Sequence, residues 1–169
     1  MSMAIPLDQI TPERLVLDQL VHTVSDALAP AETATVGPGA VTSFLGLVRD
    51  QNLGRRVLWL EYEAYAPLAL AVFQRIREEV RGQWPTVHLG IHHRTGRLEV
   101  GEASVAIAAA SPHRTETFAA CRYAIERVKQ VAPIWKREVF EGGSVWIEGA
   151  TADPSDAAAR QEAFRRACV

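Results

Sequence analysis

Two lysines seven residues apart are the first feature of this sequence that suggests chemistry. The chain has 169 residues and 18 basic side chains, of which 16 are arginines and only two, Lys129 and Lys136, are lysines. An arginine keeps its proton at physiological pH, whereas a lysine with a lowered pKa can exchange one. A chain that otherwise uses arginine and places both lysines in one short segment therefore suggests acid–base or nucleophilic catalysis there.

The helix predicted over 115–131 determines where Lys129 points. At about 100° per residue, Cys121 and Ile125 belong to a buried stripe, Lys129 lies at its edge, and Arg127 is expected on the solvent side. A partly buried Lys129 would be suited to proton transfer. The alternative is a lysine whose stem covers the edge of the core while its ammonium stays in water.

Lys136 follows Pro133, which must end the helix. In an extended segment Lys136 and Glu138 share one face and Arg137 takes the other, so Glu138 can orient Lys136. The alternative is an exposed strand with a weak ion pair. If the chain turns back at Pro133, both lysines face one pocket.

Three further residues are candidates for binding an anion. His113 and Arg114 lie directly before the N-terminus of the same helix, where free N–H groups and the helix dipole favour negative charge. Arg49 follows a strand predicted over 40–48. The alternatives are a capping loop and a solvated surface arginine. The candidate cluster is Arg49, His113, Arg114, Lys129, Lys136 and Arg137, which would suit a small phosphorylated molecule.

The histidines and the overall charge exclude other functions. His88 and His92 would be about 13 Å apart on one strand face, too far for one metal ion, so we interpret them and His93 as surface residues of a sheet and expect no metal. A net charge of −2 gives no global attraction to nucleic acid or to an anionic membrane. The sequence shows neither a signal peptide nor a membrane span, so we expect a cytoplasmic protein.

The elements that must position these residues are strands and helices in mixed order. Strands are predicted over 4–10, 40–48, 57–63, 86–92, 103–110, 134–140 and 144–148. Helices are predicted within 12–29, over 67–82 and 115–131, and after Pro154. The order indicates an α+β fold around a mainly antiparallel sheet, with one domain over 1–150 and a helical tail over 151–169. No GxGxxG or GxxxxGK[ST] loop is present, which argues against a doubly wound nucleotide-binding fold.

Segments in order between 37 and 149 resemble the large, catalytic subunit of molybdopterin synthase. They are Gly39–Arg49, Asn52, Leu60–Tyr62, His93–Gly96, Val100–Glu102, Ser111–Arg114, Lys129–Glu138 and Trp146–Glu148. The pattern K-x-x-A-P-x-W-K-[KR]-E, here Lys129–Glu138, is the most specific of them.

The resemblance implies a fold, partners and a reaction. The fold is an α/β hammerhead, a mainly antiparallel sheet with packed helices and a small β subdomain. Large subunits form a homodimer, and a small ubiquitin-like subunit at each end completes a heterotetramer. The small subunit carries sulfur as a thiocarboxylate on its C-terminal Gly-Gly. Two sulfurs pass to cyclic pyranopterin monophosphate and form the dithiolene of molybdopterin, with no cofactor.

The resemblance also assigns roles to residues. Lys129 and Lys136 match the catalytic lysines of the family. The substrate-binding positions are matched by Phe44, Arg49, His113, Arg114, Arg137 and Glu138. Two places depart from the pattern: Leu47 stands where some relatives have arginine, and Gly149 and Ala150 replace an arginine that in some relatives reaches the neighbouring subunit.

The sequence also bears on the sulfur carrier and on the alternative functions of this chain. The Gly142-Gly143 pair of this chain is internal, so we expect the sulfur carrier to be a separate protein. A non-catalytic binding module for a phosphorylated pterin-like metabolite would use the same arginines and histidine, and a structural dimer scaffold would need none of them. The two lysines distinguish the enzyme from both.

Overall fold

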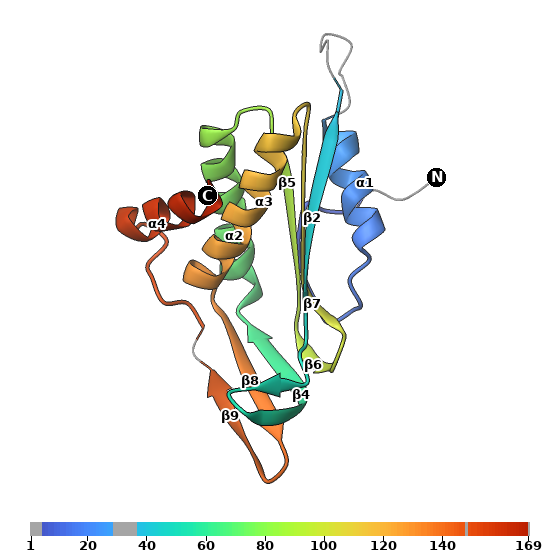
Figure 1. Cartoon of the computed structure of the whole chain (residues 1–169), viewed down its shortest axis with the longest axis vertical. Coiled ribbons are helices and arrows are strands. Elements are labelled where there is room, and N and C mark those ends of the chain that lie inside the picture. The colour runs from blue at the N-terminus through green and yellow to red at the C-terminus, as the bar shows by residue number, and fades with distance from the viewer. Residues whose placement is uncertain (1–4, 29–36, 148, 169) are drawn as a thin grey trace.

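The computed structural model describes residues 5–28, 37–147 and 149–168, and within them the chain alternates strands and helices (Figure 1). The helices are α1 (Leu17–Ala27), α2 (Ala66–Gln83), α3 (Arg114–Val131) and α4 (Ala157–Ala167). The strands are β1 (Asp8–Thr11), β2 (Ala40–Leu47), β3 (Gln51–Asn52), β4 (Arg55–Ala64), β5 (His88–Arg94), β6 (Gly96–Glu99), β7 (Ala103–Ser111), β8 (Ile134–Phe140) and β9 (Gly143–Ile147). None of the four helices is long and apolar enough to cross a membrane.

The strands form two sheets. The larger has the order β1-β5-β7-β2, in which only the pairing of β1 with β5 is parallel. The smaller contains β3, β4, β8 and β9, with β6 paired to β4, and all of its pairings are antiparallel. The small sheet projects from one end of the molecule (Figure 1). This confirms the expected α+β fold, with a mainly antiparallel sheet and a small β subdomain.

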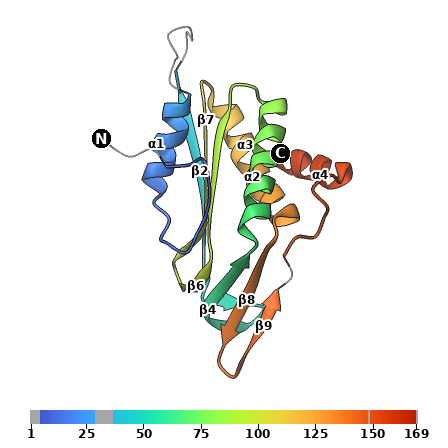
Figure 2. The ribbon, with the colours of Figure 1, turned by 180° about the vertical axis from the view of Figure 1, so that it is seen from behind.

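Helices cover both faces of the larger sheet (Figures 1 and 2). Ala108 and Ala110 of β7 pack against Leu20 of α1. Ile107 and Ala109 of the same strand belong to the core beneath α2 and α3. Because β7 is buried on both faces, its sequence is an almost continuous run of small and apolar residues.

Helix α1 approaches the sheet closely because of one glycine. A Cβ at Gly90 of β5 would lie 2.6 Å from the Leu20 Cδ1 and 3.0 Å from the carbonyl oxygen of Leu7. A larger residue at this position would therefore push α1 away from the sheet.

The C-terminal helix packs on the main core. The Asp156 carboxylate caps α4 by accepting hydrogen bonds from the backbone N–H groups of Ala158 and Ala159. The Phe164 ring stacks on Trp84, with 5.8 Å between ring centroids. The tail predicted as a helix therefore packs along α3 and beside the C-terminal end of α2, and it shares their core.

Several predicted boundaries were wrong. The first strand is Asp8–Thr11 rather than 4–10, and two short strands, β3 and β6, were predicted only as loop and turn. They were missed because strands of two and four residues flanked by turns carry too little alternation to be recognised. The predicted loop over 29–39 lies largely outside the described residues.

Candidate active site

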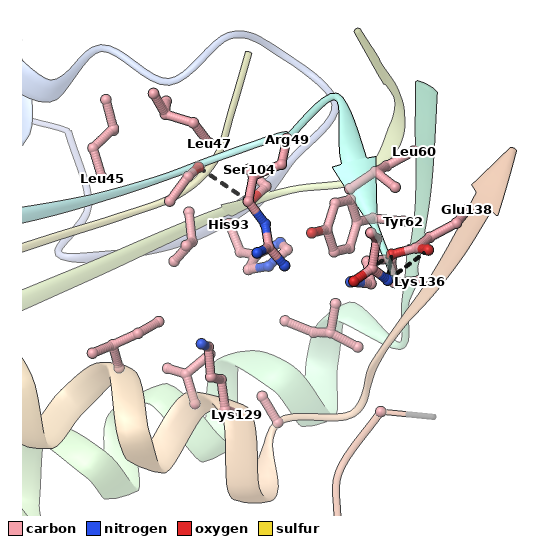
Figure 3. A pocket seen from close by; sticks show the side chains of 18 of the residues that line it. Leu45, Leu47, Arg49, Leu60, Tyr62, His93, Ser104, Lys129, Lys136 and Glu138 are labelled. Atoms are coloured by element: carbon pink, nitrogen blue, oxygen red, sulfur yellow. Dashed lines mark hydrogen bonds and ion pairs between the residues drawn. The ribbon is translucent and has the colours of Figure 1, made fainter. Parts of the chain in front are cut away.

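A cavity of about 660 Å³ lies between the C-terminal half of α3 and the region where the two sheets meet (Figure 3). Of the residues predicted from the sequence, Phe44, Arg49, Lys129, Lys136 and Glu138 line it. They come from β2, the loop after it, α3 and β8. The two lysines thus reach one cavity from a helix and from the strand that follows it.

Lys129 occupies the last turn of α3. It lies beside the buried Ile125 and Val128, and its side chain extends toward the sheet across the cavity (Figure 3). The residue is exposed on the cavity wall, so the partial burial considered for it is not observed. Within the part of the chain that the structure describes, Lys129 makes no ion pair. The ammonium group is therefore free to meet a ligand.

Lys136 is held by a buried carboxylate. Its Nζ lies 3.2 Å from the Glu138 Oε1, and Asn52 Nδ2 donates hydrogen bonds of 2.8 Å to both Glu138 oxygens (Figure 3). Glu138 is only 3% exposed. Burial acts to raise its pKa, but the hydrogen bond from Asn52 and the charge of Lys136 outweigh this and hold the pKa below its ordinary value. Glu138 thus remains a carboxylate that fixes the Lys136 ammonium.

Neutral polar side chains form the sheet side of the cavity. His93 and Tyr62 meet edge to face, with 5.0 Å between ring centroids, and the Ser104 hydroxyl donates a hydrogen bond to the Gly46 carbonyl oxygen. His93 Nδ1 lies 2.7 Å from the Arg94 carbonyl oxygen, so this nitrogen carries the proton and Nε2 is an acceptor. Burial lowers the pKa of His93 to about 4 and raises that of Tyr62. Both side chains are therefore uncharged near neutral pH.

The prediction that the histidines lie on the surface of the sheet was wrong for His92 and His93. His92 and His93 are 2% and 6% exposed, because β5 lies between β1 and β7 and has helices over both faces. His92 Nε2 pairs with the carbonyl oxygen of Pro6 at 2.8 Å. Among the residues that the structure describes, no group of three metal-binding side chains is found.

Arg137 does not reach the cavity. Strand alternation places it on the other face of β8, where it pairs with Glu61 and its guanidinium lies 5.6 Å from the centroid of the Trp146 ring. The alternation predicted from the sequence is therefore confirmed, whereas the grouping of Arg137 with the lysines in one pocket was wrong for a single chain.

Arg127 was expected in solvent and is fully buried instead. Its guanidinium bonds both carboxylate oxygens of Glu79 and the carbonyl oxygen of Pro154. The helical spacing separated Arg127 from the stripe that contains Ile125, but the side on which it lies faces α2 and not solvent. That side of α3 is covered by α2 and by the segment leading to α4 (Figure 2).

A second groove of about 490 Å³ adjoins the cavity. It shares Phe44, Ile125 and Lys129 with the cavity and continues between β2 and the outer face of α3, past Phe118. Phe118 is 61% exposed, and Cys121 in the groove has its pKa raised to about 12 by burial. Cys121 is therefore a thiol, not a thiolate, and both it and Cys168 are free cysteines.

Comparison with known proteins identifies the family. A family model described as MoaE protein matches residues 11–131. The chain belongs to the MoaE family. It is 52% identical over 111 residues to the molybdopterin synthase catalytic subunit of a Nostoc strain, covering 64% of this chain and 67% of that protein. It is 40% identical over 132 residues to the protein of the same name from Halalkalibacterium halodurans, covering 78% and 76%. The crystal structure of molybdopterin synthase from Staphylococcus aureus is similar at 36% identity and a TM-score of 0.76, covering 85% of this chain and 98% of that one.

The remaining two predicted residues of this MoaE family member lie far from the lysines. His113 is the N-cap of α3 and Arg114 its first residue, and both are exposed. Fifteen residues separate Arg114 from Lys129 along the helix, which corresponds to roughly 22 Å. A single chain therefore cannot contact one small ligand with both Arg114 and Lys129.

Sequence reasoning did not identify Tyr62, His93 and Ser104 as cavity residues, and it noted Asn52 only as part of the MoaE resemblance. Tyr62 pairs with Lys136 across β4 and β8, and Ser104 begins the buried part of β7. Their proximity depends on pairing between strands far apart in sequence, which local patterns do not reveal.

Proposed function

We propose that this chain is the catalytic subunit of a molybdopterin synthase, a sulfurtransferase that converts cyclic pyranopterin monophosphate to molybdopterin. The observation that carries the proposal is the convergence of Lys129 and Lys136, the two lysines of the sequence, on one cavity beside Arg49. The family membership and the name shared by the two relatives support the same reaction.

The reaction uses the lysines as cations and proton donors. The thiocarboxylate sulfur of the partner attacks a carbon of the pterin side chain, a C–S bond forms, and the oxygen on that carbon leaves with a proton. Water then cleaves the resulting thioester, so that the partner regains a carboxylate and the sulfur stays on the pterin. Two such cycles give the dithiolene. A fixed ammonium such as Lys136 stabilises the departing oxygen and supplies its proton.

Different walls of the cavity would bind different parts of the substrate. Arg49 and the lysines provide positive charge for the phosphate, and His93, Tyr62 and Ser104 provide uncharged hydrogen-bonding groups for the heterocycle. The Glu138 oxygens are already occupied by Asn52 and Lys136, so in this proposal Glu138 orients the lysine and does not bind the substrate.

The partner is a small ubiquitin-like protein with a C-terminal Gly-Gly thiocarboxylate. Its extended tail would lie in the groove between β2 and α3, which leads past Phe118 to Lys129. In the same proposal two copies of this chain form a homodimer within a heterotetramer. His113 and Arg114 of one copy, and Arg137 if it binds substrate, then serve the cavity of the other copy.

Reconstitution tests this proposal. The chain is mixed with thiocarboxylated small subunit and cyclic pyranopterin monophosphate, and the dithiolene product is measured after conversion to a fluorescent derivative. We expect product with the wild type, none with the carboxylate form of the small subunit, and none with Lys136→Ala although that variant folds. Saturable binding of the precursor without any product would instead indicate a binding module, and absence of both would indicate a scaffold.

A further inference from the structure

Asn52 occupies the shortest strand of the fold and is held there by a tight turn. Residues Asn52 and Arg55 pair directly, and the two residues between them, Leu53 and Gly54, have φ values of +48° and +75°. Two consecutive residues with positive φ are typical of the type I′ turn, whose twist matches that of a hairpin. Leucine is an unusual residue at such a position, and Leu53 is 84% exposed. Its side chain therefore contributes little packing, and the hairpin fixes the backbone of Asn52.

The amide of Asn52 points at Glu138 and occupies both of its oxygens. The two Nδ2–O distances are each 2.8 Å, and the residues are separated by 86 positions in the sequence. An amide nitrogen only donates hydrogen bonds and an ionised carboxylate only accepts them, so both contacts are fully satisfied only while Glu138 is ionised. The contact also stops rotation of the carboxylate about its last torsion.

Lys136 depends on the same carboxylate. Its Nζ is 3.2 Å from Glu138 Oε1, and its side chain remains 30% exposed to the cavity. A lysine side chain on a cavity wall has four flexible torsions, so one fixed anion is what holds its ammonium in place. Asn52, Glu138 and Lys136 thus form a chain of contacts from a hairpin turn to the reacting region (Figure 3).

We infer that Asn52 is a positioning residue for sulfur transfer, which acts through Glu138 to hold the Lys136 ammonium at the cavity wall. The inference rests on the proposed function for its effect on turnover, but the positioning itself is a property of the free protein. Asn52 touches no reacting atom in this account, and its removal disturbs Lys136 while leaving Lys129 unaffected.

Because the chain contains only two lysines, the order of each lysine side chain can be measured separately. Protein grown with lysine labelled with ¹³C at Cε gives one signal for each, and the relaxation of each signal reports how ordered that side chain is. In the wild type we expect the Lys136 Cε to be more ordered than the Lys129 Cε. In Asn52→Leu, which keeps the approximate shape but removes the donor, Lys136 should become as mobile as Lys129. The control Arg56→Gln changes an exposed residue of the same hairpin and should leave both signals as in the wild type.

The second measurement is the steady-state kinetics of product formation. We expect Asn52→Leu to lower kcat roughly 10- to 100-fold with KM for the precursor changed less than about twofold, because ground-state binding uses other groups. In a Glu138→Gln background the same substitution should cause no further loss, since its effect passes through Glu138. Unchanged Lys136 relaxation in a folded Asn52→Leu variant would overturn the inference. A full additional loss in the Glu138→Gln background would also overturn it. If the wild type gives no product, the proposed function fails, and the relaxation experiment still decides the role of Asn52.

Discussion

Lys129 and Lys136 have different surroundings although they share a cavity. Lys136 is paired with a carboxylate that is itself buried and hydrogen-bonded, whereas Lys129 extends from the last turn of α3 with no ion pair within the described residues. A positive charge at a helix C-terminus is favoured by the helix dipole. One ammonium is therefore held by a carboxylate and the other has no ion pair within the described residues, which suits a reaction with two sulfur transfers and a release step.

His93 makes a residue-level prediction about stability. Burial lowers its pKa from 6.5 to about 4, so between these pH values the unfolded chain binds a proton that the folded chain does not. The free energy of unfolding consequently falls as the pH decreases from 6.5 to 4, by up to about 3 kcal/mol from this residue. We expect His93→Gln to remove most of this contribution when urea unfolding is compared at about pH 7 and about pH 4.5.

The control for His93 is His22, a histidine on the exposed side of α1. His22→Gln should retain the acid sensitivity of the wild type. If His93→Gln lost as much stability on acidification as the wild type, the buried, neutral state of His93 would be contradicted.

At the scale of elements, α3 organises the molecule because it is buried on two sides. Ile125 and Val128 belong to the core on one side, and Tyr123 and Arg127, on the side facing α2, both bond Glu79 of that helix. Burial of an arginine requires such a partner, since an unpaired charge in the interior is very costly. The strip between these two sides carries Lys129, so packing on both flanks sets the direction of the lysine.

The Arg127 network predicts a large effect on stability. We expect Arg127→Ala to lower the free energy of unfolding by about 3–5 kcal/mol, because it removes the fully buried guanidinium from the Glu79 carboxylate, which then keeps only Arg75 and Tyr123 as partners. Arg165→Ala, which breaks an exposed pair with Glu162 on α4, should change stability little. Urea unfolding at neutral pH measures both, and equal effects would contradict the structural importance assigned to Arg127.

The elements were largely predictable from the sequence, and their mutual positions were not. The helix over 115–131, its end at Pro133 and the hairpin at Glu141–Gly143 follow from local rules on periodicity, proline and turns, and the structure confirms them. The burial of Arg127 was missed because α2 and the segment at Pro154 cover it, and that of His93 because Tyr62 of β4 packs on its ring; local patterns do not reveal which elements meet. Alternation along β8 is a local rule and was predicted correctly. It places Arg137 on the face away from the cavity, so the grouping of Arg137 with the lysines was the part that failed.

At the scale of the whole molecule, the cavity lies where the two sheets and α3 meet, so no single motif contains it (Figure 3). His113 and Arg114 are at the opposite end of α3, roughly 22 Å from Lys129. If they bind substrate, as the family resemblance implies, they must do so in the cavity of a second copy.

Mixing two inactive variants tests this arrangement. We expect Arg114→Ala and Lys136→Ala each to be inactive alone and to recover about a quarter of wild-type activity after subunit exchange. The reason is that half of the dimers are then mixed and each mixed dimer has one complete site of two. Full activity of Arg114→Ala, or no recovery in the mixture, would contradict a shared site. A mixture of Arg114→Ala with itself serves as the exchange control.

We propose that lysine, rather than positive charge alone, is required at position 129, at position 136 or at both. The test is single-turnover formation of dithiolene product by Lys129→Arg and Lys136→Arg, with the chain and the thiocarboxylated small subunit in excess over the precursor. Arginine preserves the charge but cannot give up its proton near neutral pH. We expect at least one of the two variants to lose about 100-fold or more in rate while its thermal unfolding stays close to that of the wild type. Wild-type rates in both folded variants would show that charge alone suffices and would contradict the assignment of the two lysines.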